Sequence, residues 1–139
     1  MRVVSIDFGD KTIGLALIDS SLDLVMPIVA IKRSVSENYF QLIKEVIQSK
    51  FIDIIVVGIP LKSDGSDGDQ ATKTRVFINQ LSTVIDNSIF TVDESFSSVE
   101  ATSNLVNSGM DSKKLANVID SAAACVILER FVKESTLLD

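Results

Sequence analysis

The chain contains no histidine, and this absence limits its chemistry more than any other feature of its composition. Nucleophilic catalysis by a Ser–His or Cys–His pair is excluded, and so are zinc sites that contain histidine. Any catalysis must therefore use carboxylates, hydroxyl groups, lysines or a hard metal ion.

Cysteine is nearly absent as well, since the only thiol is Cys125, within the apolar run AAACVIL. One cysteine cannot form an intramolecular disulfide, and without polar neighbours it is expected to be a small core residue rather than a catalytic thiol. The N-terminal residues show no signal-peptide pattern, and no apolar run reaches the ~18 residues of a membrane span. These features predict a cytoplasmic protein without membrane contact.

Basic residues are outnumbered: 13 Lys and Arg stand against 19 Asp and Glu, which gives a net charge of −6. Because phosphate binding uses clustered Lys and Arg, this charge is unfavourable for nucleic-acid binding. It does not exclude a local basic surface, and metal ions would neutralise some of the carboxylates. The 139 residues, 46% of them hydrophobic, are enough for one compact domain, and we predict a single domain over residues 1–139.

The hydrophobic pattern predicts five strands, at residues 2–8, 12–19, 23–33, 53–60 and 88–95. The predicted helices are 36–50 after a Ser34/Glu37 capping box, 71–86 with Phe77, Leu81 and Val84 on one face, a helix from a Ser97/Glu100 capping box to Gly109, and 112–134. Three strands joined by short turns form an antiparallel meander, and strands reached through crossover helices run parallel to the first. This order predicts an α/β, ribonuclease H-like fold: a mixed five-stranded sheet with helices on both faces.

Carboxylates occur where this topology would bring them to one edge of the sheet. Asp7 ends the first strand inside a very apolar stretch, Asp93 and Glu94 end the fifth, and Asp120 lies in the last helix. The carboxyl ends of parallel strands share one edge, where open α/β sheets place ligand sites. Carboxylates that converge repel one another unless cations lie among them. The pattern therefore predicts a site for Mg²⁺ or Mn²⁺, and two such ions could stabilise both the attacking and the leaving oxygen of a phosphodiester.

Each of these carboxylates also has an ordinary structural explanation when it is taken alone. Asp7 could accept hydrogen bonds from amides of the turn that follows it, Asp93 could cap the next segment, and Asp120 could face solvent. It is the combination of the three that favours a metal site.

The strand beside the first one ends in Gly58-Ile59-Pro60 and offers no carboxylate. A further metal ligand must then come from Asp93 or Glu94, or from the loop that follows Pro60. The acids of that loop are expected to belong to a solvated Gly/Asp turn region; they are Asp64, Asp67 and Asp69.

Four blocks of the sequence resemble, in order, the motifs of one family. The blocks are IDFGDKTIGLA, IIVVGIPLKSDGSDGDQA, VDESFSSVEA and VIDSAAACVILE. They resemble the YqgF/RuvX family, bacterial ribonuclease H-like proteins connected with Holliday junction resolution and with pre-16S rRNA processing. The resemblance covers nearly the whole chain. It implies a hydrolase that cuts structured RNA at the 5′ end of the small-subunit rRNA, with Asp7, Glu94 and Asp120 as catalytic, metal-binding carboxylates and Asp93 beside them.

The chain departs from the family pattern at basic positions. Thr12 follows Lys11 where the family has a basic residue, Ser95 replaces an arginine, and few basic residues precede the last aspartate. Serine cannot replace the bidentate phosphate contact of arginine, so these departures lower the affinity for nucleic acid that we expect. The remaining candidates for nucleic-acid binding, of which Lys11 is the best placed, are Lys11, Lys62, Lys73, Arg75, Lys113 and Lys114.

Three functions stay open from the sequence. The first is a metal-dependent endonuclease acting on pre-16S rRNA, with precursor ribosomal particles among its partners. The second is a Holliday junction resolvase-like endonuclease on branched DNA, which would need a symmetric homodimer to cut two strands. The third is a non-catalytic nucleic-acid or ribosome-assembly module, favoured by Ser95 and opposed by the retained carboxylates. The sequence does not distinguish a monomer from a homodimer.

Overall fold

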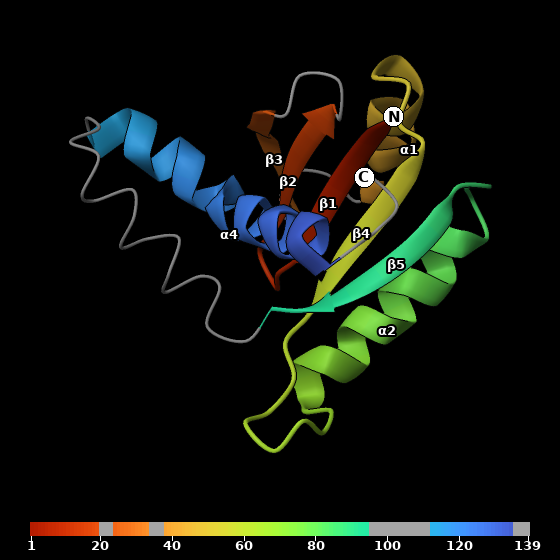
Figure 1. Ribbon diagram of the computed structural model, residues 1–139, viewed down its shortest axis with the longest axis vertical. Helices are drawn as coiled ribbons and strands as arrows, with labels where there is room; N and C mark the ends of the chain where they lie inside the picture. The colour runs from red at the N-terminus through yellow and green to blue at the C-terminus, as the bar shows by residue number, and fades with distance from the viewer. Residues whose placement is uncertain (20–23, 34–37, 95–111, 135–139) are drawn as a thin grey trace.

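The five predicted strands form one mixed sheet in the order β3-β2-β1-β4-β5 (Figure 1). The computed structural model describes residues 1–19, 24–33, 38–94 and 112–134, leaving out the side chains of residues 24, 29 and 112–121. The strands are β1 (Arg2–Phe8), β2 (Thr12–Asp19), β3 (Leu24–Lys32), β4 (Ile54–Ile59) and β5 (Ser88–Asp93). The first three pair antiparallel, whereas β4 pairs parallel with both β1 and β5. The predicted ribonuclease H-like sheet is confirmed.

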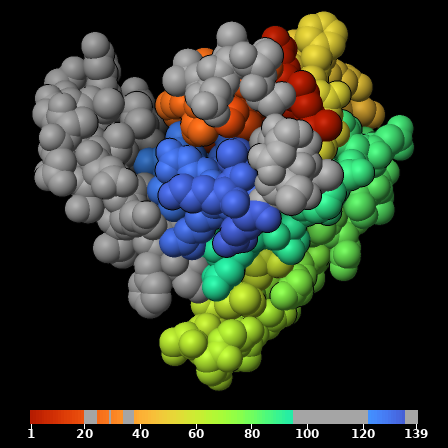
Figure 2. All heavy atoms as spheres, viewed as in Figure 1, coloured from red at the N-terminus to blue at the C-terminus, as the bar shows by residue number. Residues whose placement is uncertain are grey.

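Helices cover both faces of this sheet. Helices α1 (Tyr39–Ser49) and α2 (Asp69–Ser82) pack on one face, and α4 (Ser112–Glu134) crosses the other, as Figure 2 shows for its C-terminal half. Because side chains alternate along a strand, β1 contributes to both layers. Phe8 packs in the core under α1 and α2, while the Ser5 hydroxyl on the other face donates a hydrogen bond to the Ala124 carbonyl of α4.

The predicted helix boundaries are less accurate than the strands. Helix α1 begins at Tyr39, after its N-cap residue Asn38, instead of at residue 36. The predicted range 71–86 is wrong at both ends, because α2 begins at Asp69 and ends at Ser82. Beyond Ser82 the backbone forms short i→i−3 turns, so Val84 lies outside the helix and is 39% exposed rather than buried. Both predicted capping boxes and the helix before Gly109 lie outside the described residues.

Cys125 is half-buried against the core beneath α4, as predicted. Burial raises the pKa of its thiol to about 11, so the thiol stays protonated and unreactive at neutral pH. Within the described part of the chain, no helix is both long and apolar enough to cross a membrane.

Candidate active site: two carboxylates that meet across a central strand

Asp7 and Glu94 come together at the carboxyl ends of parallel strands. Asp7 is the penultimate residue of β1, and Glu94 follows directly after β5. The Glu94 N–H donates a hydrogen bond of 3.1 Å to the Ile59 carbonyl, which extends the pairing of β5 with β4 by one residue. The two carboxyl groups share a hydrogen bond, and Glu94 is only 8% exposed. Two of the predicted site residues, 87 positions apart in the sequence, are therefore partners in the fold.

Strand β4 lies between β1 and β5, and Gly58 makes the contact across it possible. A Cβ atom at position 58 would lie 2.9 Å from Oε2 of Glu94 and closer still to the side chain of Ile127. Contacts this close to a Cβ are essentially never seen, so any larger residue would displace one of these neighbours. In the sequence, Gly58 only indicates that this strand ends without a carboxylate. In the fold, its missing side chain leaves the space that the Glu94 side chain occupies.

The electrostatics of the pair explain why it suits a cation. Burial, followed by the charge and the hydrogen bond of Asp7, raises the pKa of Glu94 to about 9. Burial also raises the pKa of Asp7, and the hydrogen bond from Glu94 opposes that rise. Without a metal, the pair therefore holds a proton at neutral pH. A hard divalent cation could replace this proton, because carboxylate oxygens are the ligands that Mg²⁺ prefers.

The other two predicted carboxylates are described less completely. Asp93 is exposed, and its charge also raises the pKa of Glu94. Asp120 lies in α4, one helical turn before Ala124, and its side chain lies outside the described residues. Among the side chains that are described, no three possible ligands are close enough to hold a metal ion. The complete ligand set, with Asp7, Glu94 and Asp120 together, thus stays a prediction.

Arg130 is a neighbour of this site that the sequence analysis missed. Its Nη1 donates a hydrogen bond of 2.9 Å to the backbone carbonyl of Asp93, and its charge lowers the pKa of Glu94. The available signal was that Arg130 is the sole arginine in the last helix. It places a guanidinium next to the acidic pair in a chain that has Ser95 in place of the family arginine.

The predicted nucleic-acid-binding lysines whose side chains are described lie on three different segments of the chain. Lys11 is exposed in the turn after β1, and Lys62 is exposed in the loop after β4. Lys73, on α2, lies 3.6 Å from Asp10. The side chains of Lys113 and Lys114 lie outside the described residues.

Of the three acids predicted for the loop after β4, Asp64 and Asp67 lie in that loop, whereas Asp69 is the first residue of α2. Asp64 accepts hydrogen bonds from the Ser66 N–H and hydroxyl, at 2.9 and 2.6 Å. Asp67 forms a bidentate pair with Arg75, at 2.6 and 3.1 Å. These contacts agree with the expected solvated turn and occupy Arg75, one of the nucleic-acid-binding candidates.

Comparison with known proteins identifies the family of this chain. A family model described as "RuvX: Holliday junction resolvase" matches residues 1–134. A protein of Maridesulfovibrio salexigens named "Putative pre-16S rRNA nuclease" is 35% identical over 132 residues, which cover 95% of this chain and 98% of the relative. A protein of the same name from Halothermothrix orenii is 36% identical over 132 residues, covering 95% and 94%.

Two solved structures share the fold at low sequence identity. The Holliday junction resolvase of fowlpox virus has a TM-score of 0.60 at 12% identity, covering 97% of this chain and all of the viral one. RuvC of Thermus thermophilus, in complex with a Holliday junction substrate, has a TM-score of 0.59 at 11% identity, covering 98% of both chains. These two likenesses establish the fold alone. The match of the family model over nearly the whole chain, with relatives above one-third identity, shows that the chain belongs to the RuvX family.

Proposed function

We propose that this chain is a metal-dependent endonuclease that hydrolyses phosphodiester bonds of pre-16S rRNA. The observation that carries the proposal is the Asp7–Glu94 pair at the carboxyl edge of parallel strands, in which Glu94 is buried and Asp7 is partly buried. Burying two carboxylates side by side is unfavourable without a proton or a cation between them, and such arrangements concentrate at functional sites. Membership of the RuvX family supports a nuclease, and the names of the relatives support the choice of RNA.

The residues present suit Mg²⁺ or Mn²⁺. Asp7 and Glu94 would hold the metal, with Asp120 as a further ligand and Asp93 beside them. A bound divalent cation supplies the charge that activates a water molecule and stabilises the developing negative charge on the phosphate. The protein's own contribution is orientation: β1 and β5 position the two carboxylates on either side of β4, and Gly58 of β4 leaves room for the side chain of Glu94.

Arg130 supplies a positive charge at the same edge of the sheet, where a substrate phosphate would approach the metal. Its guanidinium is already held by the Asp93 carbonyl, so little side-chain entropy is lost when it contacts a phosphate. We propose this activity for one ribonuclease H-like domain comprising residues 1–139 and acting in the cytoplasm, with precursor ribosomal particles as the natural partner.

Cleavage of branched DNA is the second candidate, because the matching family model is described as a Holliday junction resolvase. It would use the same carboxylates, but paired cuts in two strands require two copies of the site and hence a homodimer. A non-catalytic assembly module is the outcome to expect if the carboxylate pair never binds a metal.

The test is cleavage of a labelled pre-16S rRNA fragment and of a four-way DNA junction in Mg²⁺, in Mn²⁺ and in EDTA. Wild type is compared with Asp7→Asn and Glu94→Gln. The matched control is Asp86→Asn, because Asp86 is exposed and precedes β5, at the opposite end of that strand from Glu94. We expect RNA cleavage that needs the metal, is lost in both site variants and is retained in the control.

The preferred substrate decides between RNA and DNA as the target. Metal-independent cleavage, or cleavage that survives Asp7→Asn, would refute the proposed site. Absence of cutting on both substrates by folded protein would favour the non-catalytic assembly module.

A further inference from the structure

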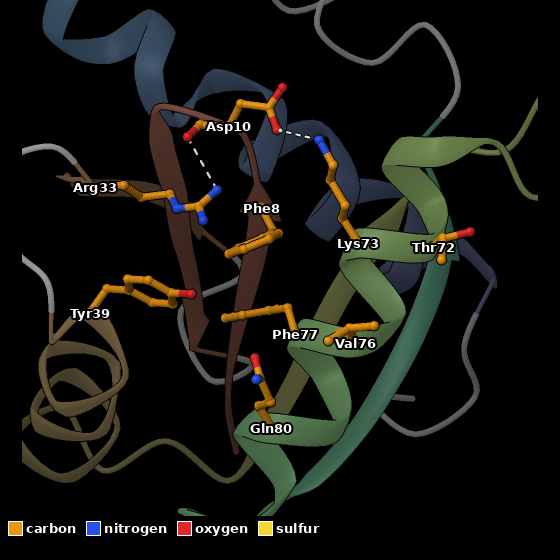
Figure 3. Close-up of a pocket in the computed structure, with 9 residues that line it drawn as sticks. All are labelled: Phe8, Asp10, Arg33, Tyr39, Thr72, Lys73, Val76, Phe77 and Gln80. Atoms are coloured by element: carbon orange, nitrogen blue, oxygen red, sulfur yellow. Dashed lines mark hydrogen bonds and ion pairs between the residues drawn. The ribbon is translucent and has the colours of Figure 1, made fainter.

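A second site lies on the face of the sheet opposite to the carboxylate pair. It is an open cavity of about 440 Å³ between the β1–β2 turn, the end of β3, the start of α1 and the side of α2. Figure 3 shows Arg33 and Lys73 reaching it from opposite sides, with Phe8 and Phe77 between them. Its volume lies within the range of about 300–1,000 Å³ typical of small-molecule sites.

Arg33 is held in place before any ligand binds. Its Nη1 donates hydrogen bonds to the carbonyls of Gly9 and Asp10, at 2.9 and 3.1 Å. Its guanidinium carbon lies 4.5 Å from the ring centroid of Phe8 and 5.3 Å from that of Tyr39. Among the described residues Nε and Nη2 have no hydrogen-bond partner, and their three N–H groups are donors of the kind that binds an anion.

Lys73 provides the second cation of the cavity. Its ammonium group lies 3.6 Å from the Asp10 carboxylate, and both side chains are more than 60% exposed. An exposed pair of this kind contributes little stability, so the lysine can turn to a bound phosphate at small cost. With Arg33 and Lys73 against one aspartate, the cavity carries excess positive charge in a chain whose net charge is −6.

The rest of the wall combines aromatic rings and Val76 with the polar side chains of Thr72 and Gln80. Phe8 and Phe77 stack with their ring centroids 4.1 Å apart, and the Tyr39 ring lies 6.0 Å from that of Phe8. Val76 is 51% exposed and also lines the cavity. Phe8 and Phe77 are 6% and 1% exposed, so the partly exposed Tyr39 is the ring that a ligand can reach. Anion donors beside such a ring match a nucleoside phosphate, whose base can pack against the ring while its phosphate binds guanidinium and ammonium groups.

We infer that this cavity binds one nucleotide of a single-stranded RNA segment, with its phosphate on Arg33 and Lys73 and its base against Tyr39 and Val76. The inference rests on the proposed function, because it treats the RNA substrate as the ligand. Asp7 and Phe8 are consecutive in β1, and their side chains lie on opposite faces of the sheet. An RNA strand that passes around the β1–β2 turn would therefore lead from the carboxylate pair to the cavity.

The composition of the chain supplies a selective probe of this cavity. Tyr39 is the only tyrosine and tryptophan is absent, so tyrosine fluorescence reports on this wall alone. The wild-type chain, kept in EDTA to prevent cleavage, is titrated with a short oligouridylate and separately with uridine monophosphate. We expect a saturable change in tyrosine emission, after correction for nucleotide absorption, with the oligouridylate binding more tightly.

Two variants on α2 distinguish binding in the cavity from a general effect of charge on RNA binding. Val76→Asp places a negative charge on an exposed residue of the cavity wall and should weaken oligouridylate binding at least about tenfold. Asn79→Asp adds the same charge to an exposed residue of the same helix that does not line the cavity, and should change it by less than about twofold. Circular dichroism spectra of both variants confirm that they are folded.

An unchanged tyrosine emission, or equal weakening by both variants, would overturn the inference even if Asp7-dependent cleavage is observed. Equal affinity for uridine monophosphate and the oligouridylate would assign the cavity to a free nucleotide and overturn the inference that it binds part of an RNA strand. A tyrosine response in a protein that cuts neither substrate would refute the nuclease proposal and leave the cavity assigned.

Discussion

Replacing Glu94 with glutamine should stabilise the metal-free protein at alkaline pH and abolish its response to divalent cations. Glu94 is 8% exposed, and burial together with Asp7 raises its pKa to about 9. In the unfolded chain the same carboxyl group titrates near its ordinary pKa of 4.5. Glutamine is uncharged and can still donate a hydrogen bond to Asp7, so it imitates the protonated acid at every pH.

The sign of the pH effect follows from proton linkage. Between the unfolded and folded pKa values, the folded protein binds a proton that the unfolded chain has released, so stability falls as pH rises, by about 1.4 kcal/mol per pH unit. A rise from pH 6 to pH 8 should then cost roughly 2.7 kcal/mol, which lowers the Tm of a chain of this size by roughly 8–10 °C. Histidine and cysteine do not contribute to this window, because the chain has no histidine and burial raises the pKa of Cys125 to about 11. Asp7 and Glu94 titrate as a pair, so the slope belongs to both.

The assay is thermal unfolding by circular dichroism at pH 6, 7 and 8, in EDTA and then in Mg²⁺ or Mn²⁺. Wild type should lose stability with pH in EDTA and regain it with metal, because the cation replaces the proton and binds only the folded state. Glu94→Gln should show neither effect, and at pH 8 in EDTA it should melt above wild type. Asp86→Asn should behave as wild type. A flat wild-type profile in EDTA, or a Glu94→Gln variant less stable than wild type at pH 8, would refute the reasoning.

Three further predictions concern the neighbours of the pair. Gly58→Ala is best made in an Ile127→Ala protein, because that change removes the side chain that a Cβ at position 58 would otherwise meet besides Glu94. Compared with the Ile127→Ala protein, the double variant should have nearly the same Tm and should bind Mn²⁺ about tenfold more weakly in calorimetry. Equal Mn²⁺ affinity of the two proteins would contradict the role of Gly58. Arg130→Gln should raise KM for RNA more than it changes kcat, and should reduce the salt slope of RNA binding by about 0.7. Ser95→Arg should do the reverse, tightening RNA binding and steepening that slope by about 0.7. An unchanged slope in filter-binding titrations would show that neither position contacts phosphate.

The sheet could be predicted because its signals are local. Alternating apolar residues mark β1, and the continuous run Ile54–Ile59 marks a strand buried on both faces. Chain order and handedness then leave few topologies, which is why the parallel edge near Asp7 and Glu94 was predictable. Helix ends were not, since α2 ends where the backbone changes to short i→i−3 turns, without a glycine or proline to mark the point.

The sequence by itself determined the types of group available: oxygen ligands without histidine, and a carboxylate at the end of each of two parallel strands. Only the tertiary structure decided which of them meet. Glu94 reaches Asp7 because the register of β4 places Gly58 between their strands, and Arg130 joins them because α4 crosses that edge. These contacts depend on strand register and helix docking, which are set by the packing of the whole core and leave no local mark in the sequence.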